Sequence, residues 1–524
     1  MGSLKEARTR LRVSLSSHWL LTVSALYFLL TPTVVVVSAG QASSQKSSSE
    51  SGYSILLDAG SSSTKTKIYR WYPPTKHQVL PHLHLLQSSR TKPALATYKS
   101  DEEGLATYLR DILHKAKQKV PEYKHSSTPI FLMATAGLRF LTGSEVHSLL
   151  QRTRSVLANT SINPFLFSNT SGASVLSGEE EGVYSWIAAN YLLGFFDKES
   201  SLDESVGVLE MGGGSTQITF IPTDPLYAEE FHVTLAGNTY ELYVQSYLQF
   251  GINGMKIKVA QQLSQTTPGF ATVGNPCMLR EDSGQIELDK SLTLTMQGTG
   301  DPERCEDLLF EVLRPYIGSN CQPKPCAIGP VYQPKLPNMT FYATQAFEYA
   351  PRNLEAVGSD KILNLGKLRE AAFHHCNRTL DEAARDSGMD KEFASDDCLT
   401  SLYMYTLLTK SYGFRDDTEA IRLTTEIGKQ SIDWPLGAML MELSPYILGD
   451  KSQYNVTCVS QPGSIKDKNA AAPVYSPTST LIVFMSLSLT LQQVPSAAVS
   501  KPIDSPLRTA LNYSLKILQT ILLQ

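Results

Sequence analysis

One short pattern occurs twice in this chain and restricts its fold more than any other feature. Each copy is an apolar run that ends in an acid, then small residues that end in Ser-Thr, then an alternating segment. The copies are Ile55–Thr64 with Lys65–Tyr69, and Gly207–Thr216 with Gln217–Phe220. An apolar run, a Gly-rich turn and an alternating run predict a β-hairpin. Two similar hairpins far apart in the sequence predict a duplicated plan, with one hairpin in each half of the protein.

The turns of both predicted hairpins have the composition of an anion site. Small side chains allow backbone amides and hydroxyls to close around a phosphate. The acid at the end of each first strand, Asp58 or Glu210, can hold a hydrated cation. One such turn alone is more often a plain hairpin. Two copies with the acid in register favour a polyphosphate held from both sides, an arrangement found in the actin, sugar-kinase and heat-shock chaperone superfamily.

Two segments between the hairpins add polar groups. A predicted buried strand continues into Ala134–Arg139, where Thr135 could bind phosphate or water and Arg139 could neutralise charge, although an Arg just inside a helix is more usually structural. Further on, Gly178–Gly182 holds three acids and precedes an apolar helix, Val183–Gly194. Acids that open a helix commonly complement its dipole. Here one of them could also take a proton from an attacking water.

Length and charge limit the classes of partner. With 524 residues the chain is long enough for two sizeable domains or one large bilobal unit. Its formal net charge of -4 gives no bulk attraction to nucleic acid, so we expect no nucleic-acid partner and a phosphate site that is local.

Both ends of the chain point to the secretory pathway. Basic residues precede the uncharged run Trp19–Gln45, so 1–51 reads as a signal peptide or signal anchor with a Ser-rich linker; a buried core helix is the third alternative. The segment 461–524 reads as a linker and tail in which 480–491 is either a weak second membrane segment or unstructured. Six glycosylation sequons fit a lumenal or extracellular body; they begin at Asn159, Asn169, Asn338, Asn377, Asn455 and Asn512.

Five motifs together resemble the apyrase family of nucleoside triphosphate diphosphohydrolases, over roughly Tyr53 to Ile447. The motifs are Asp58–Ser62, Ala134–Arg139, Gly178–Gly182, Met211–Gln217, and the pair Tyr405–Leu408 with Trp434–Gly437. Members of that family remove the γ- and then the β-phosphate of nucleotides with Ca²⁺ or Mg²⁺ and without a phosphoenzyme. The resemblance therefore implies an enzyme that acts on nucleoside tri- and diphosphates.

The resemblance also implies the architecture and the location. We expect an α/β fold of two ribonuclease-H-like lobes of the actin/hexokinase type, with the active site in the cleft between them. The first lobe would span 52–176 and the second 177–437, and a helix near 438–460 would return to the first lobe. The protein would be attached to a membrane by its N-terminal segment, at the cell surface or in the Golgi or secretory lumen. A homo-oligomer is left open.

The family's roles transfer to this chain by motif. Glu181 is expected to be the general base, Ser215 and Gln217 to hold the attacking water, Thr135 to lie beside the metal, and Arg139 to support the site. Asp58 and Glu210 would orient the metal's water ligands. The expected phosphate-binding residues are Gly60, Ser61, Ser62, Ser63, Gly212, Gly213 and Gly214, and the expected nucleobase contacts are Tyr349, Tyr412 and Phe414.

Three departures from the family stand out. Glu210 replaces a nearly invariant Asp, and the added methylene could displace a bridging water by about 1 Å, enough to cost about 10²-fold in rate. Ser63 stands where many cell-surface members have His, and Gln249 where they have a cysteine. Two alternative functions therefore stay open: a nucleotide-binding ectoprotein with impaired turnover, and an endomembrane nucleoside diphosphatase. A sugar kinase or chaperone of the same superfamily fits the secretory start less well.

Family pairing also accounts for the seven cysteines. It implies three disulfides and leaves Cys458 over; the pairs are Cys277 with Cys305, Cys321 with Cys326, and Cys376 with Cys398.

Overall fold

A computed structural model describes residues 51–459, except 77, 198–199, 228, 268, 270, 290–291, 315–322, 389, 450–452. The chain divides into two units, Met1–Ser48 and Ser49–Gln524, and every described residue belongs to the second. The predicted signal segment before residue 51 and the segment 480–491 lie outside the described residues. Within the described part, no helix has both the length and the apolar character needed to cross a membrane.

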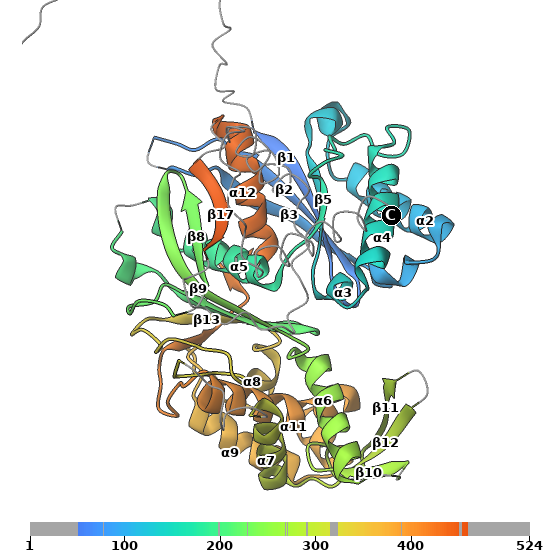
Figure 1. The fold of residues 1–524 in the computed structure, drawn as a ribbon, viewed down its shortest axis with the longest axis vertical. Helices are drawn as coiled ribbons and strands as arrows, with labels where there is room; N and C mark the ends of the chain where they lie inside the picture. Colours follow the sequence, from blue (N-terminus) through green and yellow to red (C-terminus); the bar gives the residue numbers. More distant parts are fainter. Residues whose placement is uncertain are drawn as a thin grey trace, which may run out of the picture. The chain divides into compact units, whose positions relative to one another are not determined.

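The first hairpin belongs to a five-stranded sheet (Figure 1). In spatial order its strands are β3 (His82–Thr91), β2 (Thr64–Tyr72), β1 (Gly52–Ala59), β4 (Ile130–Ala134) and β5 (Ala173–Val175). β1 pairs antiparallel with β2 and parallel with β4. The carboxyl ends of β1 and β4 therefore lie side by side at the same end of the sheet.

The second hairpin lies in the middle of a seven-stranded sheet. In spatial order its strands are β14 (Ile421–Leu423), β13 (Phe341–Gln345), β6 (Gly207–Met211), β7 (Ser215–Phe220), β9 (Asn238–Leu248), β8 (Glu230–Leu235) and β17 (Tyr454–Val459). Two small sheets complete the set; their strands are β10 (Thr272–Asn275), β12 (Leu292–Gly298) and β11 (Ser283–Asp289), and β15 (Glu426–Ile427) with β16 (Gln430–Ser431).

Helices cover both large sheets. They are α2 (Glu102–Lys117), α3 (Ala136–Arg139), α4 (Gly143–Ala158), α5 (Gly178–Leu192), α6 (Ile252–Thr266), α7 (Pro302–Leu313), α8 (Tyr349–Asn353), α9 (Leu365–Cys376), α10 (Leu380–Ser387), α11 (Lys391–Thr406) and α12 (Trp434–Leu448). Short helical turns are η1 (Leu95–Tyr98), η2 (Glu122–Ser127), η3 (Phe195–Asp197), η4 (Leu202–Glu204) and η5 (Leu407–Ser411).

Three large apolar clusters hold these layers together. One packs β1 and β4 against α2 and α4 on the outer face of the first sheet, through residues such as Leu57 and Leu109. The second contains side chains of both sheets and of α5 and α12, such as Leu56, Val208 and Leu440, so those two helices share one core with both sheets. The third packs the other face of the second sheet against α6, α7, α9 and α11. This gives the α/β architecture that the family resemblance implied.

α5 shows how local sequence places the acids of the third motif. The helix begins with a capping box, in which the Ser177 side chain accepts from the amide of Glu180 and the Glu180 carboxylate accepts from the amide of Ser177. This cap satisfies two backbone donors and fixes the first turn. The helix therefore starts at Gly178, before the apolar run that predicted it. One of the three acids has a structural role, which leaves Glu181 free to point elsewhere.

The segment predicted to return to the first lobe divides between both sheets. α12 packs mainly against α5 and also contacts β1. The following strand, β17, pairs antiparallel with β8 at the edge of the second sheet. The assignment of 438–460 to the first lobe stays a prediction.

Two of the three expected disulfides are present: Cys277 with Cys305 and Cys376 with Cys398. The third involves Cys321, which lies outside the described residues. Cys458, left over by the family pairing, is exposed.

Candidate active site

The two predicted hairpins are confirmed, and their turns close in the same way. The amide of Gly60 donates to the carbonyl of Ser63 at 3.0 Å, and the amide of Gly212 donates to the carbonyl of Ser215 at 2.9 Å. The strand registers match as well. Asp58 lies opposite Lys65 in the first hairpin, and Glu210 lies opposite Gln217 in the second. The duplicated pattern is therefore a duplicated structure.

The second turn has amides available for an anion. At the start of α6, the amides of Ile252 and Asn253 donate to the carbonyls of Gly212 and Gly213 at 3.1 and 3.0 Å. Within the described part of the chain, the amides of Gly213 and Gly214 donate to no acceptor. With the carbonyls held by α6, these N–H groups are free to bind phosphate oxygens.

Three separate segments meet at the first turn, where the side chains of Ser61 and Ser62 are exposed. The amide of Thr135 donates to the carbonyl of Ala59 at 3.2 Å. Behind the turn, Gly137 has no room for a side chain, since an added Cβ would lie 2.7 Å from the Gly60 carbonyl oxygen. From the other sheet, Gly213 approaches so closely that an added Cβ would lie 3.4 Å from Ser61 Oγ. The first, second and fourth motifs are thus brought together.

The expected base and the expected supporting arginine form an ion pair. Arg139, at the end of α3, donates through Nη2 to Glu181 Oε2 on α5. Glu181 is 8 % exposed. Burial raises the pKa of Glu181, and the Arg139 guanidinium opposes that rise. A buried carboxylate with a raised pKa and a cation beside it is suited to accept a proton.

The residues expected to hold water are linked to each other and to α5. Gln217 Nε2 donates to Ser215 Oγ at 2.9 Å and to Ser246 Oγ at 3.0 Å. Gly182, next to Glu181, packs against this strand, because an added Cβ there would lie 3.6 Å from Gln217 Cβ. β7 and the first turn of α5 therefore lie side by side.

The two acids expected to face the metal are both buried, and both have raised pKa values. Burial raises the pKa of Asp58 to about 6, against the lowering effect of Lys65 at 3.7 Å. Burial, followed by the negative charge of Glu181, raises the pKa of Glu210 to about 8. Ser185, one turn beyond Glu181 on α5, donates a hydrogen bond to Glu210 Oε2.

A buried ion pair in the same region was not found from the sequence. Lys67 on β2 donates to Asp433 Oδ2, just before α12. The sequence pattern indicates only that Lys67 belongs to an alternating strand. Asp433 directly precedes the motif Trp434–Gly437 without belonging to it. The two residues are 366 positions apart, so no local pattern could pair them. Ser185 and Ser246 were missed for the same reason.

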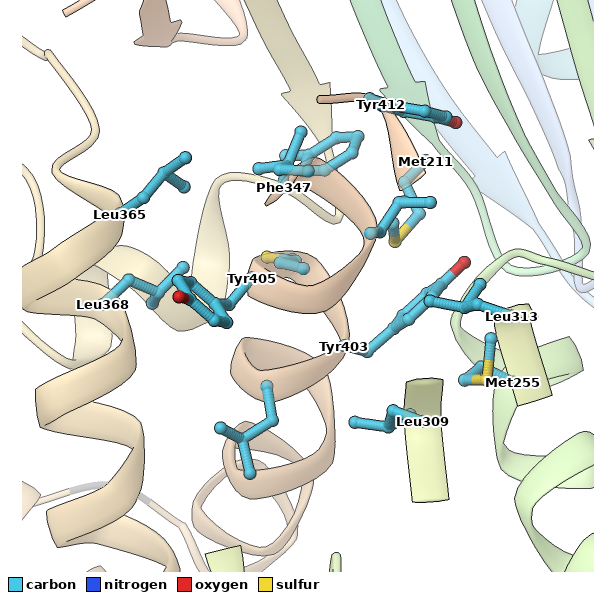
Figure 2. Packing of buried hydrophobic residues seen from close by; sticks show 14 of the residues in the cluster. Met211, Met255, Leu309, Leu313, Phe347, Leu365, Leu368, Tyr403, Tyr405 and Tyr412 are labelled. Atoms are coloured by element: carbon cyan, nitrogen blue, oxygen red, sulfur yellow. The ribbon is translucent and has the colours of Figure 1, made fainter. Parts of the chain in front are cut away.

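The aromatic residues expected at the nucleobase lie in different surroundings. Tyr349, at the start of α8, is 67 % exposed. Tyr412 is 2 % exposed and lies in the apolar cluster with Met211 and Phe347 (Figure 2). Phe414 is 6 % exposed, with its ring edge-on to Phe341 at 5.1 Å between centroids. The nucleobase contact stays a prediction, for which only Tyr349 offers an exposed ring.

The fold matches that of a solved two-lobed α/β protein. A crystal structure of nucleoside triphosphate hydrolases from Neospora caninum superposes with a TM-score of 0.58 at 15 % identity, covering 77 % of this chain and 94 % of that one. At this identity the likeness shows a shared fold. It agrees with the predicted two-lobed, actin-like α/β plan.

The chain belongs to the GDA1/CD39 (nucleoside phosphatase) family, whose model matches residues 44–456. Ectonucleoside triphosphate diphosphohydrolase 3 of Mus musculus is 30 % identical over 419 residues, which is 74 % of this chain and 77 % of that protein. Ectonucleoside triphosphate diphosphohydrolase 2 of Gallus gallus is 31 % identical over 414 residues, 74 % and 82 % of the two chains. Probable apyrase 3 of Arabidopsis thaliana is 29 % identical over 423 residues, 77 % and 84 %. The resemblance read from the motifs is confirmed, and the chain is an enzyme of the apyrase type.

Proposed function

We propose that this protein hydrolyses the terminal phosphates of nucleoside triphosphates, nucleoside diphosphates or both, with a divalent cation. The observation that carries the proposal is the pair of matching turns, one from each large sheet, which meet at Ser61 and Gly213. Arg139 of α3, the helix packed behind the first turn, pairs with the buried Glu181. Free amides, hydroxyls and a buried base in one place fit phosphoanhydride hydrolysis better than phosphate binding alone.

The carboxylates fit a cation that is reached through water. Among the described residues, no three His, Cys, Asp or Glu side chains are grouped so that they could hold a metal ion directly. Asp58 and Glu210 are nevertheless buried, and the Oδ1 atom of Asp433 is buried without a hydrogen-bond partner in the described part of the chain. Mg²⁺ commonly keeps several waters, and Ca²⁺ also accepts water ligands. Either ion would neutralise charge on the phosphate oxygens.

The chain's own residues then divide the remaining work. The Glu181 carboxylate takes a proton from the attacking water, and the Arg139 guanidinium beside it favours the ionised form that can do so. Ser215 and Gln217 hold the water in line with the terminal phosphorus, while the amides of Gly213 and Gly214 bind phosphate oxygens. Thr135 lies beside the first turn, where it can bind a phosphate oxygen or a water of the cation. Most of the rate enhancement comes from positioning and charge neutralisation.

We place this activity in the secretory lumen or outside the cell, with the N-terminal segment as the attachment to a membrane. All five described sequon asparagines are exposed, as glycosylation requires. The relatives named ectonucleoside triphosphate diphosphohydrolases support the same location.

A substrate panel tests the proposal. The full-length chain, solubilised in detergent, is assayed for phosphate release from ATP, ADP, UTP, UDP and GDP with Mg²⁺ or Ca²⁺. We expect release from at least one nucleotide, and a loss of about 10²-fold or more in Glu181→Gln, the usual range for a general base. Glu103→Gln, which changes an exposed first-turn acid of α2, is the matched control. No release from any nucleotide, or an unchanged rate in Glu181→Gln, overturns the proposal.

One observation favours a second candidate, a nucleotide-binding protein with impaired turnover. Glu210 accepts a hydrogen bond from Ser185 on α5, whereas within the described part of the chain the equivalent Asp58 pairs with Lys65 of its own hairpin and with no helix side chain. In that case nucleotide would bind tightly while phosphate release stayed slow, so affinity is measured alongside rate.

A further inference from the structure

Asp433 is buried at the start of α12 and only half satisfied. The residue is 6 % exposed, and its Oδ2 atom pairs with the ammonium of Lys67, which is 3 % exposed. Its Oδ1 atom is buried and has no hydrogen-bond partner among the residues that the structure describes. Leaving a buried acceptor without a donor is destabilising, and more so when the acceptor is charged. A simple structural ion pair gives no reason for the second oxygen to be buried without a hydrogen-bond donor.

Strand geometry puts Asp433 on the same side of the first sheet as Asp58. Lys65 and Lys67 are two residues apart on β2, so their side chains leave the same face. Asp58 lies opposite Lys65 on β1 and contacts it at 3.7 Å, so it shares that face. Because Lys67 contacts Asp433, the carboxylate at the start of α12 reaches the face that carries Asp58.

Glu210, the acid of the second sheet, lies next to the same pair of helices. α5 and α12 share one apolar core with both sheets, and Glu210 is held by Ser185 of α5. Asp58 and Asp433 lie on the face of the first sheet that packs against these helices, and Glu210 is bonded to one of them. The three acids therefore lie on elements that pack together.

We propose that Asp433 is a further acceptor for the hydrated divalent cation, with Oδ1 taking a hydrogen bond from one of the cation's waters and Lys67 holding the carboxylate in position. This inference rests on the proposed function, because it assumes that a cation is bound here. It adds an acid outside the five family motifs to the two that the motifs predicted.

Cation binding to the nucleotide-free protein tests the role of Asp433. Lys67→Met/Asp433→Asn removes one positive and one negative charge, so the net charge of the site is unchanged and no lone charge is left buried. We expect Mg²⁺ affinity, measured by calorimetry on the full-length chain, to fall by about 10- to 100-fold, the range found when a group that orients metal ligands is lost. The stabilisation of the protein by Mg²⁺ in thermal unfolding should shrink in parallel.

The controls separate a cation contact from a structural pair. Lys256→Met/Asp396→Asn makes the same chemical change at another Lys–Asp pair, 2.6 Å apart, and should bind Mg²⁺ like wild type. If the first double variant does not fold, Lys67→Gln/Asp433→Asn restores a hydrogen bond between the two side chains and takes its place. Unchanged Mg²⁺ affinity in the folded variant overturns the role of Asp433.

The two levels of the argument fail in different ways. If wild type binds Mg²⁺ and releases phosphate while the variant binds Mg²⁺ equally well, only the role of Asp433 is lost. If wild type binds neither Mg²⁺ nor Ca²⁺ and releases no phosphate, the proposed function is lost as well.

Discussion

At the residue scale, the two acids at the ends of β1 and β6 hold equivalent places but have different side-chain lengths. Asp58 contacts Lys65 in its own hairpin, whereas the longer Glu210 reaches Ser185 on α5. The substitution itself was visible in the sequence. The hydrogen bond from Ser185 could not be predicted from the sequence, because Ser185 lies on another element and belongs to no motif.

Shortening Glu210 should raise turnover. Glu210→Asp withdraws the carboxylate from Ser185 and places it as Asp58 is placed in the first hairpin. Since a misplacement of about 1 Å can cost about 10²-fold in rate, we expect kcat to rise by up to about that factor while nucleotide affinity stays unchanged. Steady-state kinetics and nucleotide binding are measured on the same preparation. A fall in kcat would mean that the Glu210–Ser185 contact belongs to the working site.

The raised pKa of Glu210 predicts how stability depends on pH. The folded protein keeps a proton on Glu210 up to about 8, while the unfolded chain loses it near the ordinary value of 4.5. The folded state therefore binds more protons in this window, and this group's contribution to stability falls as pH rises from about 4.5 to 8. We expect Glu210→Gln to flatten the fall of Tm with pH, and Mg²⁺ to flatten it in wild type, because the cation favours the ionised carboxylate.

Thermal unfolding from pH 5 to pH 8, with and without Mg²⁺, measures this effect. Glu103→Gln on the exposed face of α2 should leave the wild-type slope unchanged. Equal slopes in Glu210→Gln and wild type would show that Glu210 is already ionised in the folded protein.

At the scale of elements, the sequence predicted the hairpins and the strand into Ala134–Arg139 because each has a strong local pattern. It predicted the existence of α5 but placed its start too late, since the capping box extends the helix back to Gly178. The aromatic turn shows the limit of local patterns: the sequence could not tell that Tyr412 packs into the core, because burial depends on the elements around it.

The contact between α5 and α12 supplies a test of how the site is held. An added Cβ at Gly437 would lie 1.9 Å from the carbonyl oxygen of Tyr184, so the two helices touch backbone to backbone there. Gly437→Ala should cost about 1–3 kcal/mol, the usual range for overpacking. Phosphate release should fall too, because displaced helices would move Glu181, which lies on α5, and Asp433, which directly precedes α12. Denaturant unfolding and the nucleotide assay measure both effects.

Gly143→Ala on α4 is the control, since an added Cβ there meets nothing within 4 Å. It should be neutral or stabilising by about 0.5–1 kcal/mol, the helix preference of Ala over Gly. If Gly437→Ala behaved like this control, the close contact between α5 and α12 would not be what fixes the site.

At the scale of the whole molecule, the duplicated pattern predicted one hairpin in each half of the protein. It did not predict which elements pack the two sheets together. The shared core of α5 and α12 with both sheets depends on side chains from β1, β6 and distant helices, so it follows from packing and not from any one segment. The location of the protein also belongs to this scale. Exposed sequons occur on several parts of the described chain, from Asn159 after α4 to Asn455 on β17.

Glycosylation tests the location independently of catalysis. The full chain, expressed in animal cells, should carry N-linked glycans at the exposed asparagines, because each lies in an Asn-x-Ser/Thr sequon with its side chain at the surface. Treatment with an amidase that removes N-glycans should increase gel mobility, and each Asn→Gln change should remove part of that shift. Asn163→Gln alters a buried asparagine outside any sequon and should leave the shift whole. A chain without glycans that still released phosphate from nucleotides would keep the catalytic proposal and exclude the lumenal or extracellular one.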